Sequence, residues 1–195
     1  MSGLDSVFPQ LADCYPWEVP ELLSAAIVRK ISVLGDGYVV KDSIAVHRSA
    51  TVEKGAILKG PLIIGPQCFV AAHAYLRNGV YLSEACSIGP GVEIKASFIG
   101  ANSRIAHFNY IGNSLIGKDV NMEAGAVIAN HFNEKADDRL SFIWSEQKHQ
   151  THVTHFGALV GDYCCIGANA VLSPGTILAA GSVVPRLGLI DQSQD

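Results

Sequence analysis

The stretch from Val46 to Ile94, VHRSATVEKGAILKGPLIIGPQCFVAAHAYLRNGVYLSEACSIGPGVEI, decides the fold, because an aliphatic residue returns at every sixth position. These positions are Val46, Val52, Leu58, Ile64, Val70, Leu76, Leu82, Ile88 and Ile94. A second apolar set follows four residues after each: Ala50, Ala56, Leu62, Cys68, Ala74, Val80, Cys86, Val92 and Phe98. Helices repeat near 3.6 residues and strands near 2, so this period favours neither a helical bundle nor a sandwich. It is typical of a solenoid whose six-residue unit is one short strand and a corner, with two inward side chains.

The period continues toward residue 184 with two slips of one residue and one interruption. The continuing positions are Ile99, Ile105 and Ile111, then Ile116, Met122 and Ile128, and finally Val160, Ile166, Leu172, Leu178 and Val184. Three units return the chain to its start about 4.8 Å further along the axis, which pairs parallel strands. We therefore expect an all-β fold, a parallel β-helix over residues 42–186, with an extended loop at about 129–158 and a tail at 187–195.

A helix is predicted upstream of the repeat. The segment PELLSAAIVRKISVL, from Pro20 to Leu34, has apolar residues at helical spacing, begins with Pro and stops before Gly35. An open solenoid end exposes unpaired strand edges and core side chains. We therefore expect residues 1–41 to form a helical cap over that end.

Composition favours one soluble domain of 195 residues, with 49% apolar and only 16% charged residues. This apolar content suggests surface hidden in an oligomer. A net charge of -4 gives no electrostatic reason to expect nucleic acid or a membrane as partner. Five cysteines without a CxxC pair fit reduced thiols, and the start MSGLDSVFPQ does not resemble a signal peptide. We expect a cytoplasmic protein.

Three cations lie eighteen residues apart, Lys59, Arg77 and Lys95, each directly after an inward aliphatic residue. In a coil of eighteen residues they stack about 5 Å apart and repel one another. No acidic residue occupies the same position of the ladder, so a bound phosphate would relieve the repulsion. The alternative is three solvated surface cations.

His107, within Ile105-Ala-His-Phe-Asn-Tyr110, is a candidate general base. It falls one third of a coil from the strand end that carries Lys95, on the next rung. A histidine titrates near neutral pH and can take a proton from an attacking amine or hydroxyl. The alternative is an ordinary surface or interface histidine.

A second group of histidines, His149, His152 and His155, lies in the long loop. Three imidazoles can in principle hold zinc. The Thr and Val between them favour extended chain, in which side chains at this spacing alternate between faces. We therefore expect no metal site.

From about Leu58 to Val184 the chain resembles the acetyltransferase domain of bifunctional glucosamine-1-phosphate acetyltransferase/N-acetylglucosamine-1-phosphate uridyltransferase. Archaeal sugar-1-phosphate nucleotidylyltransferases have a similar second domain. The motifs that carry the resemblance are Ala74-Tyr-Leu-Arg77-Asn-Gly, Val92-Glu-Ile-Lys95, Ile105-Ala-His107-Phe-Asn-Tyr110-Ile-Gly and Asp119-Val-Asn121-Met-Glu-Ala-Gly-Ala-Val-Ile-Ala-Asn130. By that resemblance the β-helix is left-handed and forms a homotrimer with active sites between subunits.

The resemblance implies acetyl-CoA as acyl donor, without a metal, and the 2-amino group of glucosamine 1-phosphate as acceptor. It makes His107 the base. It also implies that Arg77 and Lys95 hold the sugar phosphate, that Tyr110, Asn121 and Asn130 contact the sugar or position the acyl group, and that Ala168 and Ala180 contact the cofactor.

Two features depart from the family's pattern. Asn130-His131 and the extended loop replace an Asn-Tyr pair and a short loop, which puts the identity of the sugar in doubt. The 45 residues before the repeat are too few for a nucleotidyltransferase domain and lack a Gly-rich phosphate loop. The sequence thus predicts an N-acetyltransferase for an amino-sugar 1-phosphate without nucleotidyltransferase activity. The alternatives are a non-catalytic sugar-phosphate-binding or assembly protein on this scaffold, and a zinc hydratase of the same fold.

Overall fold

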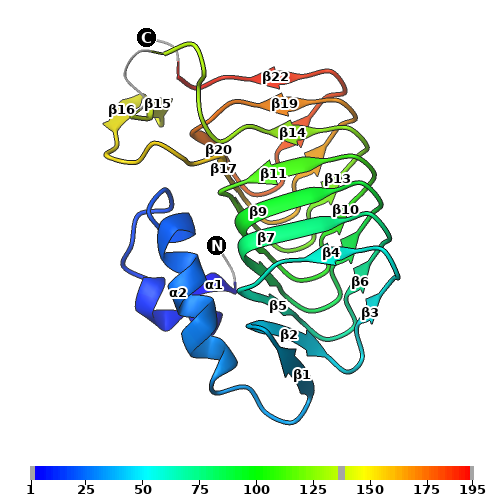
Figure 1. Cartoon of the computed structure of the whole chain (residues 1–195). Coiled ribbons are helices and arrows are strands. Elements are labelled where there is room, and N and C mark those ends of the chain that lie inside the picture. The colour runs from blue at the N-terminus through cyan, green and yellow to red at the C-terminus, as the bar shows by residue number, and fades with distance from the viewer. Residues whose placement is uncertain (1–2, 136–138, 194–195) are drawn as a thin grey trace.

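A computed structural model describes residues 3–135 and 139–193, and the predicted parallel β-helix is confirmed. Short strands stack in parallel along one axis, from β2 at the N-terminal end to β22 at the C-terminal end (Figure 1). They form three faces, and the chain passes from face 1 to face 2, face 3 and back in every coil. We call the turns between them corner 1/2, corner 2/3 and corner 3/1.

Face 1 is the seven-stranded sheet of β3 (Thr51–Val52), β6 (Phe69–Val70), β8 (Ser87–Ile88), β10 (Arg104–Ile105), β13 (Asn121–Met122), β18 (Cys165–Ile166) and β21 (Val183–Val184). Face 2 contains β4 (Ile57–Leu58), the first parts of β7 (Tyr75–Leu82) and β9 (Glu93–Ile99), β11 (Tyr110–Gly112), β14 (Val127–Ile128), β19 (Val171–Leu172) and β22 (Leu189–Ile190). Face 3 contains β2 (Ile44–His47), β5 (Leu62–Ile64), the second parts of β7 and β9, β12 (Leu115–Ile116), β17 (Ala158–Val160) and β20 (Thr176–Leu178). β1 (Tyr38–Lys41) pairs antiparallel with β2.

The inward positions form one buried core along the axis, as predicted, with one exception. Phe98 lies in register with Tyr81 on the outer side of face 3, and Ser97 pairs with Val80 in its place. The first one-residue slip therefore falls in the corner before Ser97, which reverses the side to which Phe98 points. Coils approach closely at Gly100, where a Cβ would lie 2.5 Å from the carbonyl carbon of Gly117.

The N-terminal helices are α1 (Leu4–Val7), η1 (Pro9–Leu11) and α2 (Val19–Ile31). The predicted helix forms, but its expected place over the solenoid end is wrong. Phe8, Leu23 and Ile27 are fully buried against the outer side of face 3. The outward side chains there are Ala45, Ile63, Tyr81, Phe98 and Leu115. Exposure of this apolar column to water would be more unfavourable than exposure of the solenoid end, because at that end β1 already pairs with β2. None of the helices in the described ranges is long and apolar enough to span a bilayer.

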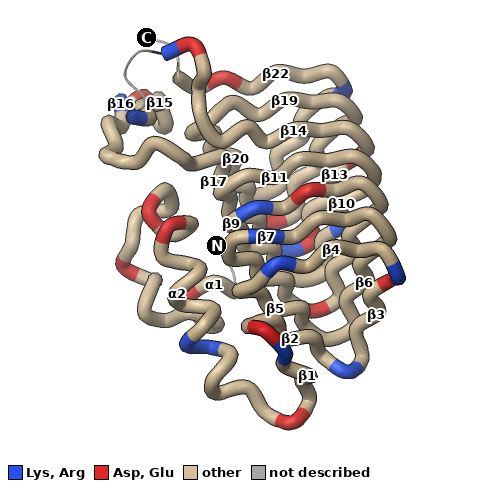
Figure 2. The backbone as a smooth tube through the Cα atoms, in the orientation of Figure 1, with Lys and Arg blue, Asp and Glu red and all other residues tan. Residues whose placement is uncertain are grey.

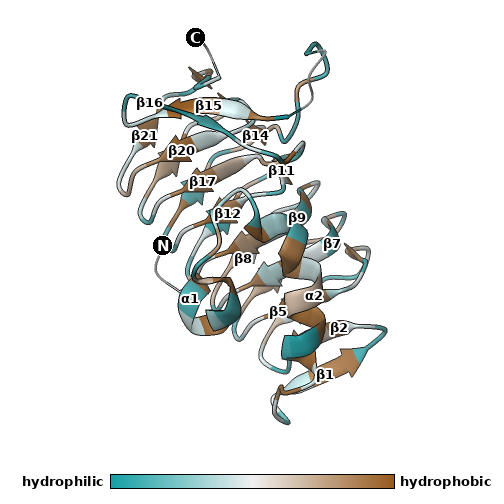
Figure 3. Cartoon of the chain, turned by 90° about the vertical axis from the view of Figure 1, so that its left-hand side faces the viewer, coloured by the Kyte–Doolittle hydropathy of each residue, from teal (hydrophilic) through white to brown (hydrophobic). Residues whose placement is uncertain are grey.

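The segment predicted as an extended loop is partly regular. It contains the antiparallel hairpin of β15 (Ser141–Trp144) and β16 (Gln147–Gln150). Phe142 and Phe156 are buried with Trp17 and with Ile177 of face 3. The hairpin therefore continues the cover that the helices begin, and both lie on the same side of the coil (Figures 1 and 3).

Candidate active site

Arg77 and Lys95 lie side by side at the end of face 2, because β7 and β9 pair in parallel with these residues in register. Lys59 continues the column, since its N–H donates to the carbonyl of Leu76 at 2.8 Å. Figure 2 shows the basic positions stacked along β4, β7 and β9. The Lys59 ammonium lies 5.1 Å and the Arg77 guanidinium 5.7 Å from the centre of the Tyr75 ring. The predicted cationic ladder therefore exists.

A carboxylate accompanies the ladder, which the sequence argument did not expect. Glu93 Oε1 accepts a hydrogen bond from Nε of Arg77 at 2.8 Å and lies 2.8 Å from Nη2 of the same guanidinium in an ion pair. Because alternate strand residues face the same side, Glu93 lies beside Lys95 on the outer surface. Burial and the Arg77 charge lower the pKa of Lys95, and Glu93 opposes them. Arg77 is therefore paired with Glu93, whereas Lys95 forms no ion pair with any carboxylate in residues 3–135 and 139–193.

A polar cluster follows on the next two rungs. The Tyr110 hydroxyl donates to Asn130 Oδ1 at 3.4 Å, and Asn130 Nδ2 donates to Asn113 Oδ1 at 2.8 Å. A Cβ at Gly112 would lie 2.7 Å from the Tyr110 hydroxyl and 2.9 Å from Cγ of Asn130, so the cluster needs glycine there. Burial, with Glu93 adding to it, raises the pKa of Tyr110. The structure thus brings the predicted residues Tyr110 and Asn130 onto the column of the cations.

His107 lies elsewhere in the same chain, at corner 1/2 between β10 and β11. Its side chain is exposed, and its carbonyl accepts the N–H of Gly125 at 2.9 Å. The buried side chain of Asn109 donates to the same carbonyl at 3.4 Å, while its Oδ1 has no hydrogen-bond partner in the described part of the chain. Face 2 separates this corner from Arg77 and Lys95, so one chain does not join the predicted base to the phosphate-binding residues.

Ala168 shares corner 1/2 with His107, two rungs further along. Its N–H donates to Glu123 Oε2 at 2.9 Å, and Glu123 also accepts two hydrogen bonds from Arg186, at 2.7 and 2.8 Å. These hydrogen bonds lower the pKa of Glu123 to about 2. Ala180 lies apart from Ala168 at corner 3/1.

Asn121 is exposed on face 1, where it pairs with Arg104 and Cys165. It contributes to two shallow cavities of about 260 and 290 Å³. The second cavity also includes Glu123 and Arg186, next to Ala168. Asn121 therefore lies near Ala168, one of the two predicted cofactor residues, and apart from the cations.

The three loop histidines have separate surroundings. The His149 ring stacks on Phe142 with centroids 5.6 Å apart, and His152 Nε2 lies 3.6 Å from Glu18 Oε1. His155 lies beside His131, with ring centroids 5.5 Å apart. The three imidazoles therefore do not converge within the chain.

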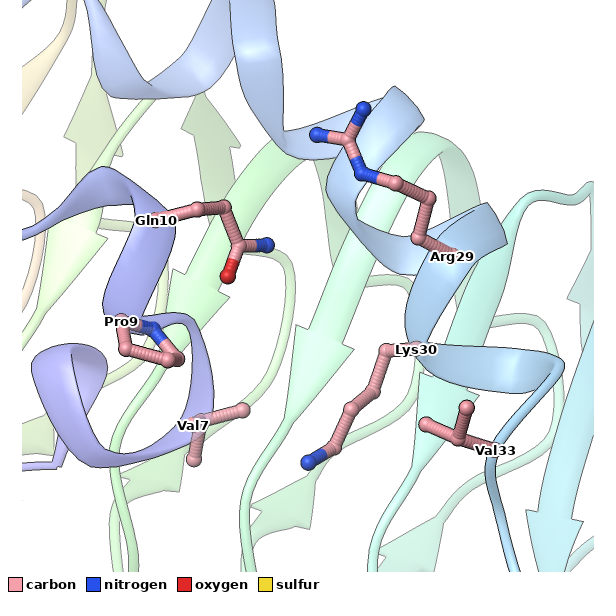
Figure 4. A pocket seen from close by; sticks show the side chains of 6 residues that line it. All are labelled: Val7, Pro9, Gln10, Arg29, Lys30 and Val33. Carbon is pink, nitrogen blue, oxygen red and sulfur yellow. The ribbon is translucent and has the colours of Figure 1, made fainter.

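A larger cavity of about 620 Å³ lies between η1 and α2 (Figure 4). The Lys30 ammonium and the Gln10 amide point into it, and Val7, Pro9 and Val33 line its walls. It contains none of the predicted site residues.

Sequence reasoning missed Glu93 and Asn113. Glu93 stands in the quoted motif Val92-Glu-Ile-Lys95, and strand alternation alone would have placed it beside Lys95. Asn113 lies in a turn with φ 47°, and no periodic signal marks it.

Comparisons with known proteins agree with this architecture. Residues 40–133 match the family model described as GMPPB C-terminal domain. The chain is 30% identical over 165 residues to the bifunctional protein GlmU of Heliobacterium modesticaldum, covering 82% of this chain and 33% of that protein. It is 29% identical over 183 residues to a bifunctional sugar-1-phosphate nucleotidylyltransferase/acetyltransferase of Sulfurisphaera tokodaii, covering 90% of this chain and 44% of that protein.

Among solved structures, a putative acetyltransferase of Bacillus cereus matches with a TM-score of 0.48 and 12% identity, covering 72% of this chain and 71% of that one. The chain spans less than half the length of the two bifunctional relatives. The resemblance predicted from the sequence is confirmed, and the chain is a relative of the hexapeptide-repeat domains of GlmU-like proteins.

Proposed function

We propose that this chain transfers the acetyl group of acetyl-CoA to the amine of an amino-sugar 1-phosphate such as glucosamine 1-phosphate. The observation that carries the proposal is the in-register pairing of Arg77 and Lys95, with Tyr110 and Asn130 on the next rungs of the same column. The two cations bind the phosphate, and the tyrosine hydroxyl and the asparagine amide contact the sugar.

The reaction needs a base for the amine. The amine nitrogen attacks the thioester carbonyl, the new N–C bond forms, the C–S bond breaks, and the leaving thiolate takes a proton to become CoA. In this proposal the His107 imidazole accepts the amine proton and returns one to the thiolate. Ala168 and Ala180 line the path of the cofactor, and Ala168 is hydrogen-bonded to Glu123, which lines the face 1 cavity with Asn121.

The site forms between subunits of a homotrimer. The helices and the hairpin cover face 3, while apolar side chains remain exposed around corner 1/2, among them Phe108 and Leu187, which are 73% and 79% exposed. Exposed apolar side chains gathered in one region favour an interface. When corner 1/2 of one subunit lies against corner 2/3 of its neighbour, His107 of the first subunit faces Arg77 and Lys95 of the second.

A second candidate is a non-catalytic sugar-phosphate-binding or assembly protein. The ion pair between Glu93 and Arg77 favours it, because a phosphate must compete with a carboxylate already in place. The two candidates differ in whether CoA is released.

The test is thiol release from acetyl-CoA with glucosamine 1-phosphate, comparing the unaltered protein with His107→Asn. Loss of a general base is expected to lower kcat by about 100-fold to 10,000-fold. The matched control is His73→Asn, since His73 is an exposed histidine at the same corner two rungs earlier. Turnover that survives in His107→Asn would refute the role of His107. Absence of turnover by the unaltered protein with several amino-sugar phosphates would favour the non-catalytic candidate.

A further inference from the structure

Asn113 connects three parts of the candidate site through its backbone and its side chain. Its N–H donates to the carbonyl of Lys95 at 2.8 Å, and its carbonyl accepts the N–H of Gly157 at 3.0 Å, at the end of the insertion at residues 129–157. Its side-chain Oδ1 accepts a hydrogen bond from Nδ2 of Asn130 at 2.8 Å. Both asparagine side chains are buried. Lys95, the polar cluster and the end of the insertion therefore meet at one buried asparagine.

The contact with Asn113 fixes the direction in which the Asn130 amide faces. A carboxamide donates hydrogen bonds only through its nitrogen and accepts them only through its oxygen. The nitrogen of the Asn130 amide is directed at Asn113. Its Oδ1 therefore lies on the other side, 3.4 Å from the Tyr110 hydroxyl and 3.2 Å from Nδ1 of His131. Tyr110 thus meets the side of the amide that can only accept.

This orientation determines the role of the Tyr110 hydroxyl group. A tyrosine hydroxyl has one proton to donate, and in this site the proton is donated to Asn130 Oδ1. The hydroxyl oxygen can still accept, and no group among the residues that the structure describes donates a hydrogen bond to it. Tyr110 lies in register with Glu93 on the outer side of face 2, next to the cations. Toward that column Tyr110 therefore offers an acceptor.

We propose that Asn113 is a positioning residue, which holds the Asn130 amide so that the Tyr110 hydroxyl accepts a hydrogen bond from a bound sugar phosphate and does not donate one. The inference rests on the proposed function for the identity of the ligand. The hydroxyl and amino groups of an amino sugar can donate hydrogen bonds, whereas the oxygens of its ionised phosphate accept them. Tyr110 therefore contacts the sugar, and the phosphate is left to Arg77 and Lys95.

The ionisation of Tyr110 reports the direction of the amide without any ligand. It is followed by NMR of protein labelled with carbon-13 at the tyrosine Cζ atoms, and Tyr110→Phe identifies the signal. Burial and the charge of Glu93 raise the pKa of Tyr110, whereas the charge of Arg77 lowers it. A phenolate that faces Asn130 Oδ1 gains no hydrogen bond from this amide. When the amide turns around, its nitrogen donates to the phenolate, which lowers the pKa of Tyr110.

Asn113→Gly removes the side chain and keeps the backbone, because Asn113 has a φ of 47°, in the left-handed region that glycine adopts readily. In this variant we expect the titration midpoint of Tyr110 to move to lower pH, with an acid dissociation constant about tenfold larger. Asn113→Asp retains an oxygen that accepts from Asn130, so its midpoint should not fall below that of the unaltered protein. The matched control is Asn102→Gly, which should leave the titration unchanged, because Asn102 is an exposed asparagine with a φ of 60° at corner 3/1.

Two results would overturn the proposal: an unchanged titration of Tyr110 in Asn113→Gly, or an equal fall of the midpoint in Asn113→Asp. Because the titration needs neither ligand nor turnover, failure of the proposed function is distinguishable. A protein that shows the expected shift but releases no CoA refutes the acetyl transfer alone. If turnover occurs, the acceptor KM should rise about twofold to tenfold in Asn113→Gly at nearly constant kcat, and by less in Asn113→Asp. An unchanged KM in Asn113→Gly would refute the role of this asparagine in acceptor binding.

Discussion

Replacing Phe8 by alanine should detach the N-terminal helices from the coil without unfolding the coil itself. Phe8 is fully buried and meets Tyr81 and Phe98 edge-on, with ring centroids 5.2 and 6.5 Å away. Removing a buried phenylalanine costs about 3–5 kcal/mol, which includes its aromatic pairs at about 0.5–1.5 kcal/mol each. At about 1.4 kcal/mol for each factor of ten, the opening equilibrium of the helical segment should rise by about two to three and a half orders of magnitude.

Native-state hydrogen exchange measures this opening directly, because α2 packs its buried side chains against the outer side of face 3, and a segment docked on a surface can open by itself. In Phe8→Ala the amides of α2 should lose protection by that factor, while those of β8 and β10 keep theirs. Leu22→Ala is the control, since Leu22 is 43% exposed on the same helix. A loss of less than tenfold at α2, or an equal loss in the coil strands, would refute the local docking described above.

Three further predictions concern the candidate site. Gly112→Ala should displace the Tyr110 hydroxyl, with a loss of unfolding free energy of about 1–3 kcal/mol in denaturation and a raised acceptor KM; an unchanged KM would contradict the role of the cluster. Lys95→Met should raise stability by up to about 1 kcal/mol at neutral pH and weaken phosphate binding, because Lys95 stands opposite Arg77. The pKa of Lys95 is lowered in the native protein, so the native protein loses this proton at a lower pH than the unfolded chain does. The destabilisation caused by charged Lys95 therefore fades as the pH rises toward 10.5, and Lys95→Met should not show this increase of the unfolding free energy with pH. The same increase in Lys95→Met would contradict the prediction. Coexpression of His107→Asn with Lys95→Met should restore about a quarter of normal activity, since each shared site needs one intact residue from each chain; no recovery would argue against shared sites.

The sequence was sufficient for the coil but not for what covers it. The six-residue period identifies inward positions because the core imposes the same requirement on every rung. It did not reveal the side on which Phe98 lies, since a one-residue slip can fall anywhere within a corner. The covered face was nevertheless readable in principle, because its outward positions include Ile63, Tyr81 and Leu115, which are all apolar. Apolar outward residues on successive rungs indicate that another segment packs on this face, and a helix over the solenoid end would leave them exposed.

The site was predictable where it follows the repeat. Arg77 and Lys95 stack because the coil length is fixed, and Tyr110 and Asn130 follow one and two rungs later. The contribution of the insertion was not predictable, because the meeting of His131 and His155 depends on hydrogen bonds that join the two ends of a long loop. Periodicity says nothing about such a closure.

Acetyl transfer itself is tested most directly by following glucosamine 1-phosphate and acetyl-CoA with the unaltered protein by NMR. We predict that an acetamide forms on the sugar in equal amount to the CoA thiol released, with neither product when the acceptor is omitted. Thiol release without an acetylated sugar, or no reaction with any amino-sugar phosphate, would contradict the proposed acetyl transfer.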